Sequence, residues 1–192
     1  MCTITKLFVK NYKLLRDDII PLNPTLNIFV GDNDAGKSTI LECISIITSG
    51  KLNGNGYDRQ LKANLVNSEV WKEDVDTIEA GDTPIPPKII IEAYCDGDSL
   101  YIGASYELRA DCPGIRMVAS LPPETADLYM TMLQSHQIKD VPVDLYTVTF
   151  RYFNSDPVNF RTSPFRSVLF AAGRRDYSSV LGKFVSDSIA DH

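Results

Sequence analysis

The sequence predicts an α/β fold, and three of its patterns support that prediction. Residues 26–30, LNIFV, form a compact apolar run between Pro24 and Gly31, as expected for a buried strand. Apolar residues then recur at helical spacing after Gly36, so a strand is expected to lead directly into a helix. Residues 88–153 contain further strand-like runs separated by turn residues, which predicts an antiparallel β lobe beside this unit.

The composition describes an ordinary globular chain. Its 192 residues are enough for one domain with a real core, and the 44% hydrophobic and 23% charged residues are the balance that globular proteins use. No apolar stretch is long enough to span a bilayer, and the N-terminus lacks the unbroken apolar core of a signal peptide. A cytoplasmic protein without a membrane partner is therefore expected, and the net charge of −6 argues against one that coats nucleic acid.

Cysteine and histidine patterns typical of metal sites are absent from the sequence. None of the four cysteines belongs to a C-x-x-C pair, and the two histidines lie far apart. We therefore expect reduced thiols packed in the core or on the surface, with no zinc site. The residues concerned are Cys2, Cys43, Cys95, Cys112, His136 and His192.

Residues 1–50 are predicted to form a strand, loop and helix unit. Residues 4–10 have the pattern of a first strand, and residues 11–18 contain the turn that follows it. After the strand at 26–30 comes a helix that is expected to end at Gly50, because glycine commonly terminates helices. The apolar face of this helix comprises Ile40, Leu41, Ile44 and Ile47.

The remainder of the chain divides into three segments. Residues 51–87 are rich in turn-forming residues and predict a loop-rich insert with one helix over 61–78. Residues 88–153 predict the β-rich lobe, and residues 154–192 lead toward a C-terminal part. Within the last two segments, strands are expected at 88–95, 99–110, 114–121 and 143–153, and helices at 122–137 and 178–192.

The loop between the strand at 26–30 and its helix, GDNDAGKST, fits the pattern G-x-x-x-x-G-K-[ST]. A polyphosphate needs many hydrogen-bond donors at close range, and backbone N–H groups supply them where glycine leaves the approach open. The following helix adds unpaired N–H groups and the positive end of its dipole. The loop therefore predicts a nucleotide site of P-loop NTPase type, made by Gly31, Asn33, Asp34, Ala35, Gly36, Lys37, Ser38 and Thr39.

Three side chains of this loop have separate expected roles. The Lys37 amine is expected to reach the β- and γ-phosphates, and the Ser38 hydroxyl is the expected ligand of Mg²⁺. Thr39 offers a further donor near the α-phosphate. Because no N-K-x-D motif for guanine recognition is present, ATP with Mg²⁺ is the expected cofactor pair.

A second acidic metal site, which nucleotide hydrolysis requires, is not recognisable in the sequence. Glu92 follows an isoleucine run, but a patterned surface strand explains it equally well. The run that leads to Asp144 is interrupted by Pro142, which a central strand rejects. We therefore expect the isolated chain to bind ATP without appreciable turnover.

The first fifty residues resemble the ATPase head of the RecF/SMC class of ABC-type P-loop ATPases, and in particular of the OLD (overcoming lysogenisation defect) family of ATPase-nucleases. The resemblance rests on ITKLFVKNYKLL and on LNPTLNIFVGDNDAGKSTILECI, whose loop has the form G-x-N-x-x-G-K-S-T. More loosely, VLFAAGRRDYSSVLGKF resembles the segment that precedes a helical dimerisation insert in OLD-type proteins. The resemblance implies an ABC/SMC-type head with an antiparallel β lobe.

Further features follow only from that resemblance. It implies that Asn11 and Lys13 lie near the adenine and ribose, and that two heads sandwich ATP in a homodimer or higher oligomer. It implies double-stranded DNA and a helicase-like protein as partners, and endonuclease activity in a full-length parent. The signature loop, second acidic strand and Toprim domain of such proteins are not recognisable here, so residues 1–192 are expected to be the N-terminal part of a head that is incomplete at its C-terminus.

One stretch of the chain, residues 151–175, is both basic and aromatic. It holds five arginines and five aromatic residues against the single acid Asp156, so contact with DNA phosphates is one interpretation. Intramolecular pairs or subunit contacts are the other. The arginines are Arg151, Arg161, Arg166, Arg174 and Arg175.

Three functional hypotheses remain open from the sequence. The leading one is the ATP-binding head of an OLD- or RecF-like DNA-processing or phage-defence ATPase. The second is a complete small P-loop kinase, for which the arginines of 151–175 could serve a lid. The third is a non-catalytic module whose assembly depends on nucleotide.

Overall fold

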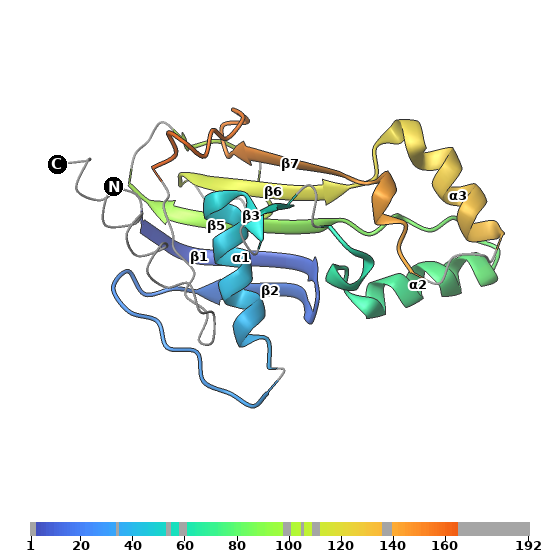
Figure 1. Cartoon of the computed structure of the whole chain (residues 1–192), viewed down its shortest axis with the longest axis horizontal. Coiled ribbons are helices and arrows are strands. Elements are labelled where there is room, and N and C mark those ends of the chain that lie inside the picture. The colour runs from blue at the N-terminus through green and yellow to red at the C-terminus, as the bar shows by residue number, and fades with distance from the viewer. Residues whose placement is uncertain are drawn as a thin grey trace.

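A five-stranded antiparallel sheet forms the centre of the protein (Figure 1). The computed structural model describes residues 3–33, 35–52, 55–57, 61–97, 101–104, 106–108, 112–135 and 140–164. The strands are β1 (Thr3–Tyr12), β2 (Leu15–Pro21), β5 (Ile89–Asp96), β6 (Gly114–Ser120) and β7 (Thr147–Tyr152), with a separate small pair, β3 (Lys51–Leu52) and β4 (Asn55–Gly56). The helices are α1 (Lys37–Ser49), α2 (Ser68–Glu79) and α3 (Ala126–Gln134), with 3₁₀ turns at Ala63–Leu65, Pro123–Thr125 and Val143–Leu145.

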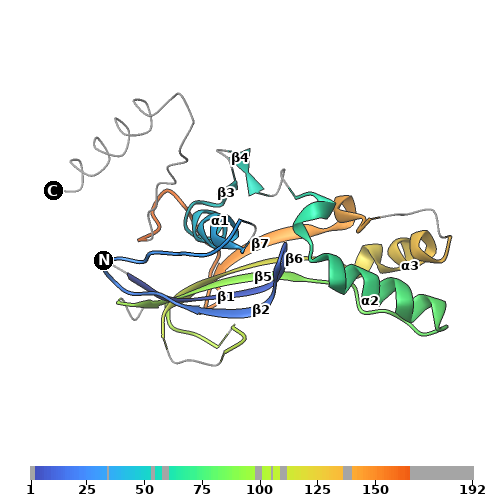
Figure 2. The ribbon, with the colours of Figure 1, turned by 90° about the horizontal axis from the view of Figure 1, so that it is seen from below.

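The sheet has the strand order β2-β1-β5-β6-β7, so β1 lies between two neighbours and β2 forms an edge. Every neighbouring pair is antiparallel. Helix α1 lies across one face of the sheet, while α2 and α3 lie beyond one end of it (Figures 1 and 2). Because β5, β6 and β7 follow one another both in the sequence and in the sheet, the expected antiparallel lobe is confirmed as a meander.

Alternating side chains divide the sheet between two apolar clusters. On the face that carries α1, Ile89 and Ile91 of β5 are fully buried with Ile46 and Ile47 of the helix. On the opposite face, Ile90, Tyr94, Phe8 and Phe153 form a smaller cluster, against which Tyr106 and Leu108 pack. Both faces of β5 are therefore covered, which explains why the sequence of this strand is apolar almost throughout.

Helix α1 begins and ends at glycines, as the sequence predicts. Gly36 precedes it with a φ of 83°, and Gly50 follows it with a φ of 65°, where its N–H donates to the Ile46 carbonyl at 2.8 Å. Only glycine adopts such angles at little cost. At Gly50 the ring of Phe160 also lies so close that a Cβ would stand 2.5 Å from it.

The strand expected at 26–30 is absent from the structure, and this prediction is wrong. Leu26, Ile28 and Val30 are 69%, 76% and 89% exposed, and their segment belongs to no ladder. An isolated extended segment has no partner for its N–H and C=O groups, so it does not count as a strand. Both sides of β1 are already occupied by β2 and β5, which leaves no place for the segment beside that strand.

The strand expected at 99–110 is also wrong for the described residues 101–104 and 106–108. The one pairing there is an isolated bridge between Ile102 and Pro113. Tyr106 and Leu108 instead cover the second apolar cluster of the sheet, so this apolar segment packs over a sheet face and does not extend the sheet. The physical cause is burial of apolar surface, which a sequence pattern alone does not distinguish from strand pairing.

Three of the remaining elements follow the predictions but start later in the sequence. The helix expected over 61–78 begins at Ser68, after a 3₁₀ turn, and the strand expected over 143–153 begins at Thr147. The helix expected over 122–137 occurs as α3 after a 3₁₀ turn that contains Pro123. Among the described residues, no helix combines the length and the apolar character that crossing a membrane requires. The helix expected over 178–192 lies outside the described residues.

Candidate nucleotide-binding site

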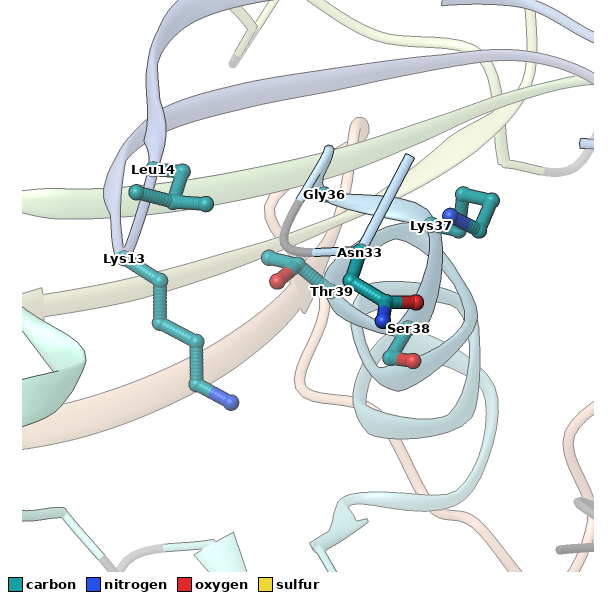
Figure 3. Close-up of a pocket in the computed structure, with 7 residues that line it drawn as sticks. All are labelled: Lys13, Leu14, Asn33, Gly36, Lys37, Ser38 and Thr39. Atoms are coloured by element: carbon teal, nitrogen blue, oxygen red, sulfur yellow. The ribbon is translucent and has the colours of Figure 1, made fainter. Parts of the chain in front are cut away.

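Two segments of the chain line a cleft of about 580 Å³ beside the start of α1 (Figure 3). One is the turn between β1 and β2, and the other is the glycine-rich loop with the first residues of α1. The described lining residues are Lys13, Leu14, Asn33, Gly36, Lys37, Ser38 and Thr39. The structure thus brings Lys13 together with five of the residues that the loop motif predicts.

The loop supplies main-chain donors at the mouth of α1. The left-handed Gly36 is buried, and its carbonyl accepts the first helical hydrogen bond from Ile40 N–H at 3.0 Å. The N–H groups of the first helical turn therefore remain available for an anion. Ser38 is exposed at this end of α1, whereas Thr39 is 7% exposed.

The Lys37 amine bonds to its own loop. Its Nζ donates to the Gly31 carbonyl at 2.6 Å and also to the Asp32 carbonyl. These bonds fold the side chain over the loop and place a positive charge at the edge of the cleft. A phosphate group offers stronger, charged acceptors to the same amine, so the bonds to the carbonyls are expected to be exchanged when a nucleotide binds.

The β1–β2 turn, which forms the cleft wall opposite the glycine-rich loop, is held in place by a small polar cluster at α1. Lys13 Nζ lies 2.5 Å from Glu42 Oε2, with both side chains about three-quarters buried. The Tyr12 hydroxyl donates to the same carboxylate oxygen at 3.3 Å. Burial raises the pKa of the Tyr12 hydroxyl, so it remains a donor at neutral pH. Glu42 thereby ties the β1–β2 turn to the helix that follows the phosphate loop.

Other predicted site residues lie outside the lining. Asn11 is 7% exposed, and its amide donates to the Lys88 carbonyl at 3.0 Å, so its side chain supports the turn from behind. Gly31 and Ala35 belong to the loop but not to the lining residues. Asp34 lies outside the described residues.

Glu92 is fully buried, on the sheet face away from α1. Its carboxylate accepts from the Tyr94 hydroxyl at 2.5 Å and from the Glu107 N–H, and it lies 3.2 Å from Arg116 Nε. Burial raises the pKa of Glu92, while these donors and the guanidinium oppose that shift. Its neighbours Ile90 and Tyr94 belong to the cluster on that face. Glu92 is therefore a structural group, but the expectation that it lies on a surface strand is wrong, because its side chain is buried in a central strand of the sheet.

Asp144 lies outside the strands, because it is an exposed residue of a 3₁₀ turn after Pro142. No acidic residue occurs among the described residues that line the cleft. Within the described part of the chain, no three His, Cys, Asp or Glu side chains lie close enough together to hold a metal ion. The described cleft residues therefore offer the Ser38 hydroxyl, but no carboxylate, to a nucleotide-bound Mg²⁺.

The basic and aromatic stretch is described as far as residue 164. Phe153 is fully buried and Tyr152 is 6% exposed, so neither ring is available for stacking on a base. The Phe160 ring packs edge-on against Phe150 at 5.1 Å between centroids. Arg151 donates to the Ser155 carbonyl at 2.8 Å. Arg166, Arg174 and Arg175 lie outside the described residues.

Sequence reasoning missed three residues that shape the site. Leu14 lines the cleft, Glu42 holds Lys13, and Asn67 holds the main chain of the β1–β2 turn. Glu42 had a weak signal, since it lies four residues after Ser38 on one helical face. Asn67 precedes an apolar-periodic run and an acidic residue, which is a helix-start signal, but its contact with the turn spans 54 residues of sequence.

Comparison with protein-family models identifies the family of this chain. The AAA ATPase domain family matches residues 3–156, which confirms the expected nucleotide-binding ATPase fold. One solved structure, an SMC ATPase studied for ATP-driven dimerization and DNA-stimulated activation, matches with 18% identity and a TM-score of 0.39. That match covers 60% of this chain and 62% of the SMC chain, so this chain spans less than two thirds of that relative. No curated protein sequence matches significantly.

Proposed function

Since this chain belongs to the AAA ATPase domain family, we propose that it is the N-terminal, ATP-binding part of the head of an OLD- or RecF-like ATPase-nuclease that processes DNA or defends against phage. One observation supports the nucleotide-binding part of this proposal. Gly36, Lys37 and Ser38 at the start of α1 line the same cleft as Lys13, and the Lys37 side chain is folded back over its own loop (Figure 3). That arrangement offers main-chain donors, a helix dipole and two amines to a triphosphate, with the Ser38 hydroxyl for Mg²⁺.

The expected chemistry is binding without appreciable turnover. The described lining residues supply positive and neutral groups but no carboxylate to hold the metal or orient water. In the parent enzyme we propose that a second head completes the site, as the resemblance to OLD and RecF/SMC proteins implies. Double-stranded DNA, a helicase-like protein and a cytoplasmic location belong to the same proposal.

Calorimetric titration with Mg²⁺-ATP tests the proposal directly. We expect the wild-type chain to bind and Lys37→Ala to weaken binding at least tenfold, because a charged contact to the phosphates is lost. Lys51→Ala is the matched control, since this exposed lysine lies at the far end of α1 and its loss changes the net charge equally. Absence of a binding heat for the wild-type protein would refute the proposal.

Two measurements separate the alternatives. A small P-loop kinase would transfer phosphate from ATP to a metabolite in a substrate panel, whereas we expect no transfer. A nucleotide-dependent assembly module would change its mass in light scattering on addition of a non-hydrolysable ATP analogue. Turnover of ~1 s⁻¹ or above that Lys37→Ala abolishes would contradict binding without hydrolysis.

A further inference from the structure

The turn that forms one wall of the nucleotide cleft has an unusual backbone. Asn11 and Lys13 both have left-handed backbone angles, with φ values of 58° and 51°, although neither is glycine. Such angles carry an energetic cost for residues with a Cβ, and surrounding contacts must hold them. Lys13 and Leu14 of the same turn line the cleft. The position of this wall therefore depends on whatever holds the turn.

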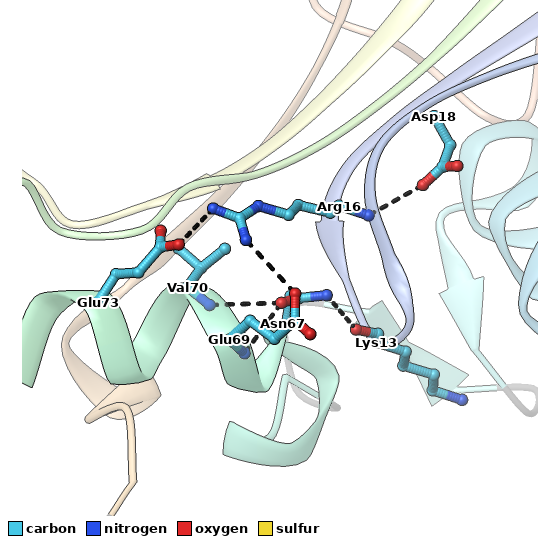
Figure 4. Close-up of polar contacts among 7 residues, drawn as sticks. All are labelled: Lys13, Arg16, Asp18, Asn67, Glu69, Val70 and Glu73. Atoms are coloured by element: carbon cyan, nitrogen blue, oxygen red, sulfur yellow. Dashed lines mark hydrogen bonds and ion pairs between the residues drawn. The ribbon is translucent and has the colours of Figure 1, made fainter.

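A segment from the insert, residues 65–67, holds it. The Lys13 N–H donates to the Leu65 carbonyl at 2.9 Å, and the Asn67 N–H donates to the Asn11 carbonyl at 3.0 Å. The Asn67 side-chain amide then donates to the Lys13 carbonyl at 2.8 Å (Figure 4). Asn67 is 5% exposed, so these bonds are shielded from water. The turn is thus fastened to a segment that lies more than fifty residues away in the sequence.

The same side chain also starts helix α2. Asn67 Oδ1 accepts from the N–H groups of Glu69 and Val70 at 3.0 and 3.3 Å, as an N-cap residue does. Arg16, just after the turn, reaches the exposed face of α2 with ion pairs to Glu69 and Glu73 at 3.4 and 2.5 Å. Figure 4 shows Asn67 between the β1–β2 turn and the first turn of α2.

Helix α2 is in turn connected to α3. Asp74 of α2 is 6% exposed and accepts a hydrogen bond from the Tyr129 hydroxyl of α3 at 2.9 Å. A continuous set of contacts therefore runs from the cleft wall through Asn67 and α2 to α3. None of these residues beyond the turn is among the described residues that line the cleft.

We propose that Asn67 is a positioning residue that couples the nucleotide cleft to helix α2. Its amide group fixes the main chain of Lys13, while Glu42 fixes the Lys13 amine, so the wall faces the phosphate loop at a set position. Nucleotide affinity then depends on a residue that touches no nucleotide. By linkage, a bound nucleotide stabilises the start of α2 by the same free energy. The inference rests on the proposed nucleotide binding.

Two substitutions at one position separate this role from helix capping. Asn67→Asp keeps an oxygen that caps α2, since aspartate is an equally good N-cap residue, but it loses the donor to the Lys13 carbonyl. Asn67→Ala loses both functions. Asp76→Asn is the control, because Asp76 is exposed on the same helix and the change again exchanges a carboxylate and an amide.

Fluorescent Mg²⁺-ATP analogue binding and thermal melting of the full chain are the first measurements. We expect Asn67→Asp to weaken binding roughly five- to tenfold and to lower the melting temperature, because the buried Lys13 carbonyl loses its donor and faces a carboxylate oxygen. We expect Asn67→Ala to weaken binding as much and to lower the melting temperature, and Asp76→Asn to change neither. A purely structural role of Asn67 predicts instead that Asn67→Asp binds like the wild type, and that result overturns the proposal.

Hydrogen exchange provides a readout without nucleotide. In Asn67→Asp, the amides of residues 12–16 are expected to exchange faster while those of α2 keep their protection. In the wild type, the nucleotide analogue is expected to slow exchange at residues 65–70 as well as at the phosphate loop. Unchanged exchange in both comparisons overturns the coupling. If the wild type binds no nucleotide, the proposed function fails and the coupling fails with it, whereas binding that ignores Asn67→Asp defeats the coupling alone.

Discussion

Strand β5 and the segment 26–30 both contain an apolar run, but their surroundings are very different. In β5, Ile89, Ile90 and Ile91 are at most 5% exposed, because strands flank it on both sides and apolar side chains cover both faces. In the segment 26–30, Ile28 is 76% exposed and the segment belongs to no ladder. The comparison shows that an apolar run predicts extended backbone, whereas strand formation depends on a partner that the run itself does not encode.

The largest expected effect comes from the same substitution made in both places. Ile91→Ala removes buried methyl and methylene groups from the α1 face of the sheet and should lower the free energy of unfolding by about 2–5 kcal/mol. Ile28→Ala removes an exposed side chain and should change it by less than about 0.5 kcal/mol. Urea unfolding followed by circular dichroism measures both values.

Equal losses of stability at the two positions would break the comparison. That result would mean that Ile28 is covered in solution by another part of the protein or by a second copy. The slope of unfolding free energy against urea serves as an internal check, since an unchanged slope shows that the same surface is exposed on unfolding.

A medium effect on stability is expected from Asp74, a buried carboxylate of helix α2. Burial raises the pKa of Asp74 from 3.8 to about 6, against the opposing hydrogen bond from the Tyr129 hydroxyl and with a smaller contribution from the Glu73 charge. The folded protein therefore holds this proton up to about pH 6, while the unfolded chain releases it near pH 4. Stability from this group is complete below about pH 4 and is lost as the pH rises toward 6.

Asp74→Asn is expected to remove this pH dependence while keeping an oxygen that accepts from Tyr129. The slope of unfolding free energy between pH 4 and 6 should change by up to about 1.4 kcal/mol per pH unit, the value for one proton. Thermal unfolding over that range measures the slope. The exposed Asp76→Asn is the control and should leave it unchanged. Identical slopes for wild type and Asp74→Asn would show that Asp74 is solvated.

Local patterns were sufficient for the parts of the fold whose partners are close in sequence. The glycines around α1 and the spacing of Ile40 and Ile47 predicted the helix and the phosphate loop, since both depend on backbone geometry within a few residues. The meander from β5 to β7 was predictable in part, because its strands pair in the order of the sequence, although the strand expected at 99–110 does not occur among the described residues. Long-range contacts were not: the bond from Asn67 to Lys13 depends on how the insert folds back. The unpaired state of 26–30 likewise depends on which strands flank β1.

The smallest change in stability is expected from a charge introduced into the exposed segment 26–30. Ile28→Lys should leave the free energy of unfolding within about 0.5 kcal/mol of the wild type, because the side chain at this position is exposed. Its effect should appear in self-association instead. The exposed Leu26, Ile28 and Val30 form an apolar, unpaired segment of the kind that pairs with other chains, and lysine is a residue that natural sheet edges use against such pairing.

Sedimentation at rising protein concentration measures this self-association. Lys10→Ile is the control: it makes the opposite exchange, lysine to isoleucine, in strand β1, which is already paired on both sides. We expect Ile28→Lys to remain monomeric at concentrations where the wild type begins to associate. If the wild type and Ile28→Lys associate alike, the segment 26–30 is not what brings the chains together. If both proteins stay monomeric while Ile28→Lys loses several kcal/mol of stability, the Ile28 side chain is covered within one molecule. The difference in burial between segment 26–30 and β5 would then be smaller than the exposed fractions indicate.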